Sequence, residues 1–396
     1  MSTATSPTAP STPQQAVELA RKMYQPVRDQ ARRIDDERHV PAELVAEFTN
    51  AGLVRTLVPA RWGGLEYPIT TAFEIALELG RASGSMGWVA SLLMDHALFM
   101  ARYGERAQQD VWGESGPDVR IATSFAPLGK ATAAEGGYVL DGTWSWVSAA
   151  THCDWIMIGA VLPSDDGKHD YRLCLVPMSA MEVIDTWYSA GLRGTGSDSV
   201  KLTEVFVPEH RTLSMELVRE GTPPGADVNP APQYVKPLRI HGGYGFVAPA
   251  IGMARGVLDA WIDQSRSKVG TYTREQLAAA LPMQLALGRA ATQVDWAETA
   301  VRRCIAMSES TAPVDLDDRV RNRRDITYAA GQLMAAVNDI VQVAGAGALH
   351  DDSPIQRGWR DLRAVSCHVM MNFNAASENY GRRAFGLPLN PLDPFF

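Results

Sequence analysis

The sequence predicts an α+β protein in which helical segments at both ends of the chain enclose a β domain. Charged and apolar positions alternate with helical spacing from about residue 14 to 109, and the same periodicity returns after about residue 245. Between them lie short apolar runs separated by turn clusters such as "EGG" and "GTGSD", which is typical of strands. A chain of 396 residues that is 46% hydrophobic is long enough for two or three folding units. This order excludes a helix-only bundle and a doubly wound parallel sheet.

The N-terminal part is predicted as a disordered tail over 1–14 and a helical domain over 15–119. The tail is rich in Ser, Thr and Pro and lacks the apolar core of a signal peptide. The segment "PAELVAEFTNAGL" starts with Pro and ends at Gly, as helices commonly do. Further along, spacings of four, four and three place one set of residues on a single helical face: Trp88, Leu92, His96 and Phe99.

The middle part is predicted as an antiparallel β domain over 120–217, carried by runs such as "GYVLDGTWSWVS" and "SVKLTEVFVP". A connector dense in Pro and Gly follows over 218–236. The C-terminal part, 237–396, is predicted as a four-helix bundle. Its four candidate helices cover 245–268, 274–309, 316–345 and 354–383.

Composition favours small molecules as partners. The formal net charge is -8 and no Lys/Arg run exceeds a pair, so neither nucleic acid nor an anionic membrane surface is expected as a partner. The longest apolar run, Trp155–Leu162, is too short to cross a bilayer. The four cysteines form no C-x-x-C pair and the histidines show no metal-ligand spacing. We therefore expect a soluble, cytoplasmic protein without a metal site.

Two glycine motifs and two histidines are weak signals when taken singly. "GAGALH" at 345–350 follows a helical pattern instead of the strand that a dinucleotide fingerprint requires. "HGGYGF" lacks the Lys and Ser/Thr of a phosphate loop, so both motifs also fit helix ends and turns. His96 and His368 each share an apolar helical face, where a histidine is usually a core residue.

Three longer segments, taken in order, resemble the acyl-CoA dehydrogenase superfamily. They are "LVPARWGGLEY" (57–67), "GLRGTGSDSVKLTEVFVPEHR" (191–211) and "QVAGAGALHDDSPIQRGWRD" (342–361), and the resemblance extends over about 16–389. It implies an N-terminal helical domain, a middle β domain and a C-terminal four-helix bundle. It also implies a homotetramer that binds flavin between subunits.

One departure from the dehydrogenases redirects the expected function. Where they place a catalytic carboxylate after the Arg360–Asp361 pair, this chain has Val369, and no acid occurs between Asp361 and Glu378. His368 stands beside that gap. In this respect the chain resembles the flavin-dependent monooxygenases of the same fold, in which a His on the last helix, a His on an N-terminal helix and a Ser in the β domain line one pocket. The resemblance implies catalytic roles for His96, Ser148 and His368.

The resemblance also implies a cofactor and the residues around it. Reduced flavin, with FMN favoured over FAD, would react with dioxygen as co-substrate to give a C4a-hydroperoxide. Ser148 would contact flavin N5, with Trp144 and Trp146 shielding the ring, although both tryptophans also fit plain cross-strand packing. The implied cofactor-binding residues are Ser124, Trp146, Ser148, Arg266, Gln342, Gly345 and Gly347. The implied substrate pocket contains Trp88, His96, His368 and Asn372.

The expected activity is hydroxylation of an aromatic or heteroaromatic small molecule. His368 would act as general base toward an acidic substrate proton, since imidazole titrates near neutral pH. No NAD(P)H fingerprint is present, so a separate NAD(P)H:flavin reductase is expected to supply reduced flavin. Two alternatives stay open: an acyl-CoA dehydrogenase or oxidase with a relocated base, which would retain flavin, and a non-catalytic relative that binds a ligand in the same cavity.

Overall fold

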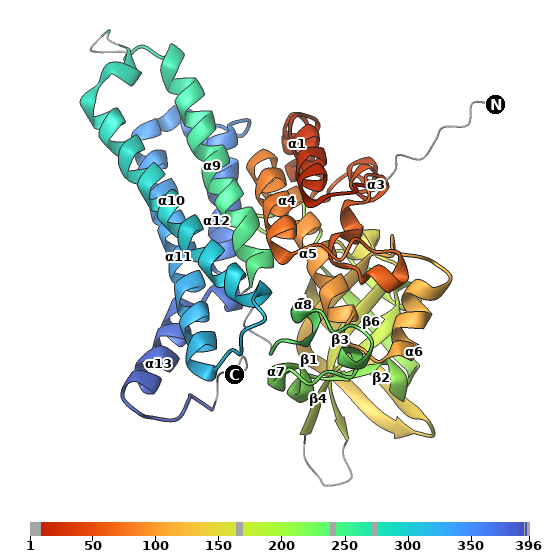
Figure 1. The fold of residues 1–396 in the computed structure, drawn as a ribbon. Coiled ribbons are helices and arrows are strands. Elements are labelled where there is room, and N and C mark those ends of the chain that lie inside the picture. Colours follow the sequence, from red (N-terminus) through yellow and green to blue (C-terminus); the bar gives the residue numbers. More distant parts are fainter. Residues whose placement is uncertain are drawn as a thin grey trace, which may run out of the picture.

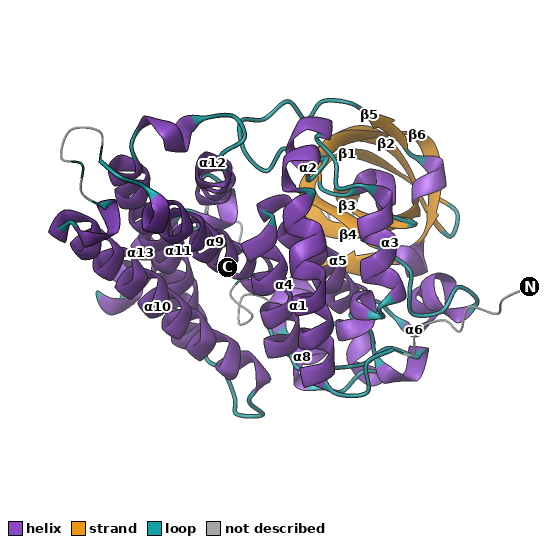
Figure 2. Cartoon of the chain, turned by 90° about the horizontal axis from the view of Figure 1, so that it is seen from above, coloured by secondary structure: helices purple, strands orange, loops and turns teal. Residues whose placement is uncertain are grey.

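The computed structural model describes residues 9–163, 169–237, 243–270, 274, 276–391 and 393. Figure 1 shows the N-terminal helices above the sheet and a long bundle of C-terminal helices beside them. Seen from above in Figure 2, the strands lie on one side of the molecule and the bundle on the other, with α1 (Pro13–Asp29) and α4 (Ile69–Ala82) between them. The helix, strand, helix order predicted from the sequence is confirmed.

The N-terminal helices surround α5, which is the central helix of this part. All residues of α5 except Asp95 are buried, and a helix that is apolar on nearly every side belongs in a core. At the start of the segment, Thr12 caps α1 by accepting the amide proton of Gln15. The helices are α1 (Pro13–Asp29), α2 (Ala31–Glu37), α3 (Ala42–Asn50), α4 (Ile69–Ala82), α5 (Gly84–Met100) and α6 (Glu105–Gln108).

The middle domain is a seven-stranded sheet in the order β5-β6-β2-β1-β3-β4-β7. The sheet is mixed, so the predicted purely antiparallel arrangement is wrong: β1 and β3 are parallel. The reason is that β2 ends where β1 begins, and the connection after it crosses to the other side of β1, where β3 starts with Trp155 beside Ile121. The strands are β1 (Ile121–Ala134), β2 (Gly137–Val147), β3 (Trp155–Pro163), β4 (His169–Pro177), β5 (Glu182–Ile184), β6 (Asp198–Pro208) and β7 (Thr212–Ser214).

Two short helices, α7 (Met215–Glu220) and α8 (Pro232–Val235), lead from the sheet into the C-terminal bundle.

The last helical segment of the bundle is interrupted. The prediction of one continuous helix over 354–383 is wrong, because the structure divides it into α12 (Pro354–Ser366) and α13 (Phe373–Ala384). His368 has extended backbone angles, φ -65° and ψ 138°, and the Asn372 side chain caps α13 by accepting the amide proton of Ala375. The helices are α7 (Met215–Glu220), α8 (Pro232–Val235), α9 (Tyr244–Ser267), α10 (Leu281–Glu309), α11 (Leu316–Ala344), α12 (Pro354–Ser366) and α13 (Phe373–Ala384).

Close packing of α4 against α9 joins the N-terminal helices to the bundle. A Cβ at Gly80 would lie 2.6 Å from the carbonyl oxygen of Pro249, and one at Gly252 would lie 2.2 Å from that of Leu77. Only glycine permits this approach. One large apolar core therefore runs through both helical parts, and a smaller one lies within the sheet. Among the described residues, no helix is both long and apolar enough to cross a membrane.

Candidate active site

Three of the residues predicted from the sequence meet where α5, the end of β2 and the segment after α12 converge. The indole Nε1 of Trp88 donates to Ser148 Oγ across 3.1 Å. The ring of His368 lies 5.7 Å from that of Trp88, centroid to centroid. Phe246, near the start of α9, stacks on His368 at 4.5 Å and contacts Trp88 at 5.2 Å. The structure thus builds a hydroxyl, an imidazole and two aromatic rings into one cluster.

Behind Ser148 lies a chain of buried hydroxyl groups. Ser148 Oγ is 2.7 Å from Ser197 Oγ, which is 2.7 Å from Thr195 Oγ1, and Thr195 donates to the carbonyl of Leu192 at 2.8 Å. Sequence reasoning missed Ser197 and Thr195. Both lie in the turn "GLRGTGSDS", whose resemblance to a family signature was the available signal.

Asp361 fixes this turn to α12. Its Oδ1 accepts the amide proton of Leu192 at 2.7 Å, and its side chain is buried. Burial raises the pKa of Asp361 to about 6, because a desolvated carboxylate loses the stabilisation that water gives its charge. The turn behind Ser148 and the helix that leads to His368 are therefore held together.

His96 lies apart from this cluster, two helical turns beyond Trp88 on α5. Its Nδ1 donates to the carbonyl of Ile121 at 2.6 Å, since a carbonyl oxygen can only accept. Burial lowers the pKa of His96 to about 4. The ring is therefore neutral at physiological pH, with its proton on Nδ1 and a lone pair on Nε2.

His368 is half-buried and lies in the break between α12 and α13, not on a helical face as predicted. The amide of Met370 donates to its Nδ1 at 3.2 Å, so the neutral ring carries its proton on Nε2. Asn372 was predicted in the substrate pocket. Its side chain is exposed and accepts the amide proton of Ala375 at 3.2 Å, so its oxygen serves as a helix cap.

The two tryptophans of "WSW" have different surroundings. Trp144 is fully buried in the core of the sheet and donates to the carbonyl of Gly159 at 2.8 Å, so the prediction that it shields a bound ring is wrong. Trp146 is 71% exposed, and its φ of 62° lies in the left-handed region. The β2–β6 register shifts between Trp144 and Val147, which marks a bulge. Beside it, buried Ser124 donates to the carbonyl of Ser145 at 3.4 Å.

The other predicted cofactor residues lie at the opposite end of the bundle. Gln342 and Gly345 are exposed, and an added Cβ on Gly347 would be 3.5 Å from Lys268 Nζ. Arg266 is exposed and pairs with Asp263 at 3.4 Å. Phe246, which stacks on His368, lies near the start of α9, and Lys268 follows the last residue of α9, 22 positions later. At the rise of an α-helix, this end of the bundle is roughly 30 Å from His368. One chain does not bring the two groups together.

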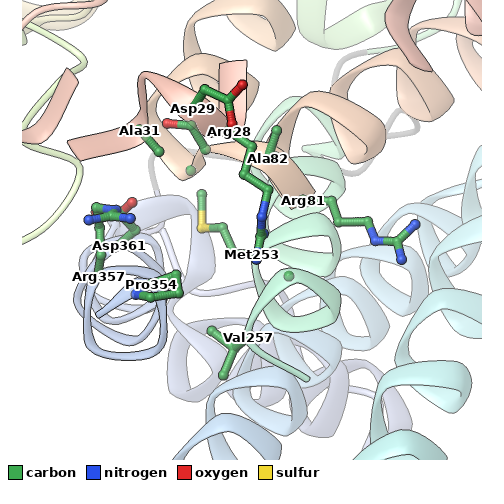
Figure 3. Close-up of a pocket in the computed structure, with 15 residues that line it drawn as sticks. Arg28, Asp29, Ala31, Arg81, Ala82, Met253, Val257, Pro354, Arg357 and Asp361 are labelled. Atoms are coloured by element: carbon green, nitrogen blue, oxygen red, sulfur yellow. The ribbon is translucent and has the colours of Figure 1, made fainter. Parts of the chain in front are cut away.

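A cavity with a volume of about 240 Å³ lies elsewhere, between α1, α4, α9 and α12. Figure 3 shows its wall, which includes Arg28 from α1, Met253 and Val257 from α9, and Arg357 and Asp361 from α12. None of the site residues predicted from the sequence lines it. In the part of the chain that the structure describes, no group of three or more His, Cys, Asp or Glu residues could hold a metal ion.

Comparison with known proteins gives consistent matches along the chain. Residues 12–115 match the family model "Acyl-CoA dehydrogenase, N-terminal domain" and residues 244–373 match "Acyl-CoA dehydrogenase, C-terminal domain". The chain is 34% identical to the flavin-dependent monooxygenase oxygenase subunit HsaA of Mycobacterium tuberculosis, covering 91% of this chain and 93% of that protein. It is 33% identical to the oxygenase component of FADH2-dependent resorcinol hydroxylase from Rhizobium sp., covering 91% of each. The structure of XiaF from Streptomyces sp. with FADH2 and glycerol has a TM-score of 0.85 at 27% identity, covering 97% of this chain and 98% of XiaF.

Proposed function

Because the chain belongs to the acyl-CoA dehydrogenase family, and within it to the oxygenase components of two-component flavin-dependent monooxygenases, we propose that the cluster of Trp88, Ser148 and His368 is its active site. The enzyme hydroxylates an aromatic compound with reduced flavin, as its relatives' names indicate for them. The observation that carries the site assignment is the meeting of these three residues from separate parts of the chain.

The residues present fit a reduced flavin. Ser148 offers a fixed hydroxyl for N5 of the ring, and Trp146 offers an indole that 71% exposure leaves open to a bound ring. A bulky residue held at a φ of 62° is strained, and such strain is commonly retained at binding sites. Ser124 lies near these two on the neighbouring strand, as its bond to Ser145 shows. We place the flavin ring against these three side chains.

Bound reduced flavin supplies the two electrons that let one oxygen atom of dioxygen enter the substrate ring while the other leaves as water. The chain contributes a dry, preorganised pocket. Trp88 and Phe246 contact each other and the His368 ring, so they form one apolar wall beside the imidazole. Exclusion of water in this pocket limits wasteful release of hydrogen peroxide.

We propose separate roles for the two histidines, because His96 lies two helical turns along α5 from the cluster that contains His368. Since His368 accepts from Met370 at Nδ1, the neutral ring presents N–H at Nε2. We propose that it stabilises the phenolate form of a phenol by donating to the phenolate oxygen, while the phenolic proton passes to solvent, whereas the sequence alone suggested a general base. Neutral His96 presents an acceptor at Nε2 and orients a hydroxyl group. An ionised phenol is electron-rich enough to accept oxygen.

The remaining parts of the proposal concern partners. A separate NAD(P)H:flavin reductase supplies the reduced flavin, because "oxygenase subunit" and "oxygenase component" in the relatives' names imply a second component. Dioxygen is the co-substrate, and we retain FMN as the favoured flavin. We also propose that the protein acts in the cytoplasm as a homotetramer. A flavin site that joins the two groups of predicted residues would need more than one subunit, because one chain keeps the groups apart. In the tetramer Gln342, Gly345, Gly347 and Arg266 of one subunit hold the distal part of a flavin bound at Ser148 of another.

Equilibrium titration and turnover test this function together. Reduced FMN and reduced FAD are titrated without oxygen, and a flavin reductase, NADH and a panel of phenols are then added in air. We expect tighter binding of reduced than of oxidised flavin and a hydroxylated product. Ser148→Ala should still consume oxygen but release hydrogen peroxide in place of product. A variant with unchanged product per oxygen consumed would remove Ser148 from the site.

A further inference from the structure

The four oxygen atoms behind the active site lie so close together that each neighbouring pair must share a proton. They belong to Ser148, Ser197, Thr195 and the carbonyl of Leu192, at successive separations of 2.7, 2.7 and 2.8 Å. The three side chains are 8%, 5% and 2% exposed in the same order. Two oxygens at such distances repel unless a hydrogen lies between them. Each separation is therefore a hydrogen bond with a definite donor.

The direction of each bond follows from the carbonyl end. The Leu192 oxygen can only accept, so the single hydroxyl proton of Thr195 is donated there. Ser197 must then donate to Thr195, and Ser148 must donate to Ser197. Trp88 Nε1 is a donor only and occupies one lone pair of Ser148 Oγ. Ser148 is left with one free lone pair and no free proton.

Further hydrogen bonds hold the Leu192 end of this hydroxyl network in place. The amide of Leu192 donates to buried Asp361, and the carbonyl of Thr195 accepts the amide proton of Ala149, the residue after Ser148. These contacts hold the turn against both α12 and the end of β2. Reversal of the hydroxyl chain would require the Thr195 hydroxyl to leave Leu192.

We propose that Ser197 and Thr195 are positioning residues that hold the Ser148 hydroxyl as a hydrogen-bond acceptor, so that the site selects a ring N–H over an unprotonated ring nitrogen. The inference rests on the proposed flavin site. N5 of reduced flavin carries a hydrogen, whereas N5 of oxidised flavin is an acceptor and would face the remaining lone pair of Ser148. The network therefore favours capture of reduced flavin and release of oxidised flavin.

Two variants test the direction of the network. Thr195→Val keeps the shape of the side chain but frees the Ser197 proton to turn toward Ser148, and Ser197→Ala frees the Ser148 proton directly. Affinities for reduced and oxidised FMN and FAD are measured at equilibrium, together with the midpoint potential of the bound flavin. In both variants we expect the preference for reduced over oxidised flavin to fall about tenfold. For a two-electron couple this lowers the midpoint potential by about 30 mV.

Matched variants separate this role from packing. Thr195→Ser retains the hydroxyl and should retain the wild-type preference. Ser199→Ala removes a buried hydroxyl of β6 that bonds to Thr186 and Ser145 and takes no part in the network of Ser148, Ser197 and Thr195. This variant should also retain the preference for reduced flavin. If Thr195→Val does not fold, Ser197→Ala alone decides.

The outcomes distinguish the inference from the function on which it rests. A wild-type protein that binds neither form of flavin contradicts the proposed function itself. A wild-type protein that prefers reduced flavin, with the same preference in Ser197→Ala and Thr195→Val, overturns the inference and leaves the flavin site standing. Equal affinity of the wild type for both forms also overturns the inference.

Discussion

His96 links burial to the pH dependence of stability. Its folded pKa of about 4 lies below the value of 6.5 for a free imidazole, so the folded state favours the neutral ring. The resulting stabilisation is complete above pH 6.5 and is lost as the pH falls toward 4, because only the unfolded chain takes up the proton. At pH 5 about 2 kcal/mol of the free energy of unfolding should be lost through this residue.

Urea unfolding of the flavin-free protein at pH 7 and pH 5 measures this loss. His96→Asn keeps an N–H for the Ile121 carbonyl but cannot titrate, so its stability should fall less than that of the wild type.

Asp361 acts in the opposite direction, since its raised pKa of about 6 makes stability fall as the pH rises from 3.8 through 6. It is present in both proteins, so the comparison cancels it. Identical pH dependence in both proteins would contradict a buried neutral His96, and exposed His350→Asn serves as the control.

His368 is tested through the rate of oxygen transfer. His368→Ala should fold and bind reduced flavin, because the ring stacks at the surface of the pocket and is only half-buried. Oxygen transfer to a phenol should fall roughly 10²- to 10⁴-fold, the usual cost of losing a group that assists a proton transfer. The loss should shrink as the pH approaches 10, where a phenol ionises without help.

Single-turnover mixing across this pH range gives the result. A variant that transfers oxygen at the wild-type rate would make His368 a packing residue. A loss that is equally large at every pH would assign it to substrate binding and not to ionisation.

At the scale of elements, the bulge in β2 holds Trp146 at a strained backbone angle, and we have proposed that its exposed indole contacts the flavin. A residue with a Cβ that is held at a φ of 62° costs about 1–2 kcal/mol of stability, and Trp146→Gly removes this strain. Glycine offsets about 0.5–1 kcal/mol of the gain, because it has more conformational freedom in the unfolded chain. We therefore expect Trp146→Gly to raise the free energy of unfolding by up to about 1.5 kcal/mol while flavin affinity falls.

Trp146→Ala is the matched variant, because it removes the indole but keeps the strain. Both variants should bind flavin more weakly in an equilibrium titration, and only Trp146→Gly should gain stability in urea. Unchanged flavin affinity in both would show that the exposed indole serves another surface.

At the scale of the whole molecule, the predicted cofactor residues lie in two groups at opposite ends of the bundle. If a flavin site takes one group from each of two subunits, two defective variants should complement each other. Ser148→Ala damages the ring end, and Gly345→Val damages the distal end by placing a side chain at φ 74° and ψ 179°, a conformation that glycine alone adopts readily.

Co-expression of the two variants tests this arrangement. Random mixing should leave about a quarter of the sites with both groups intact, because each site draws one group from each of two chains. Reduced flavin bound per subunit and coupled turnover should both recover toward that fraction. Recovery near zero would show that each site is built within one chain, and a mixture of the separately purified, unexchanged variants is the control.

Helix periodicity was enough to predict the bounds of α9 and α11 closely, because burial of one element against any apolar neighbour requires the same spacing of side chains. Strand runs such as Gly137–Val147 were equally clear. Interruptions of helices and the partners of individual side chains were harder to predict. The helix expected over 354–383 is interrupted by side-chain caps at His368 and Asn372. Both residue types also occur within helices, so the sequence does not show that these two act as caps.

Residue spacing and motif order were enough to predict the order of domains, the family, and Ser148, His96 and His368 as candidates, because both are properties of the chain before it folds. The tertiary structure decided which candidates meet. It separated buried Trp144 from exposed Trp146, placed the proton of His368 on Nε2, and set Ser197 and Thr195 behind Ser148. These outcomes depend on hydrogen bonds between residues far apart in sequence. Such bonds fix the direction of each donor only when folding has brought the atoms within about 3 Å of one another.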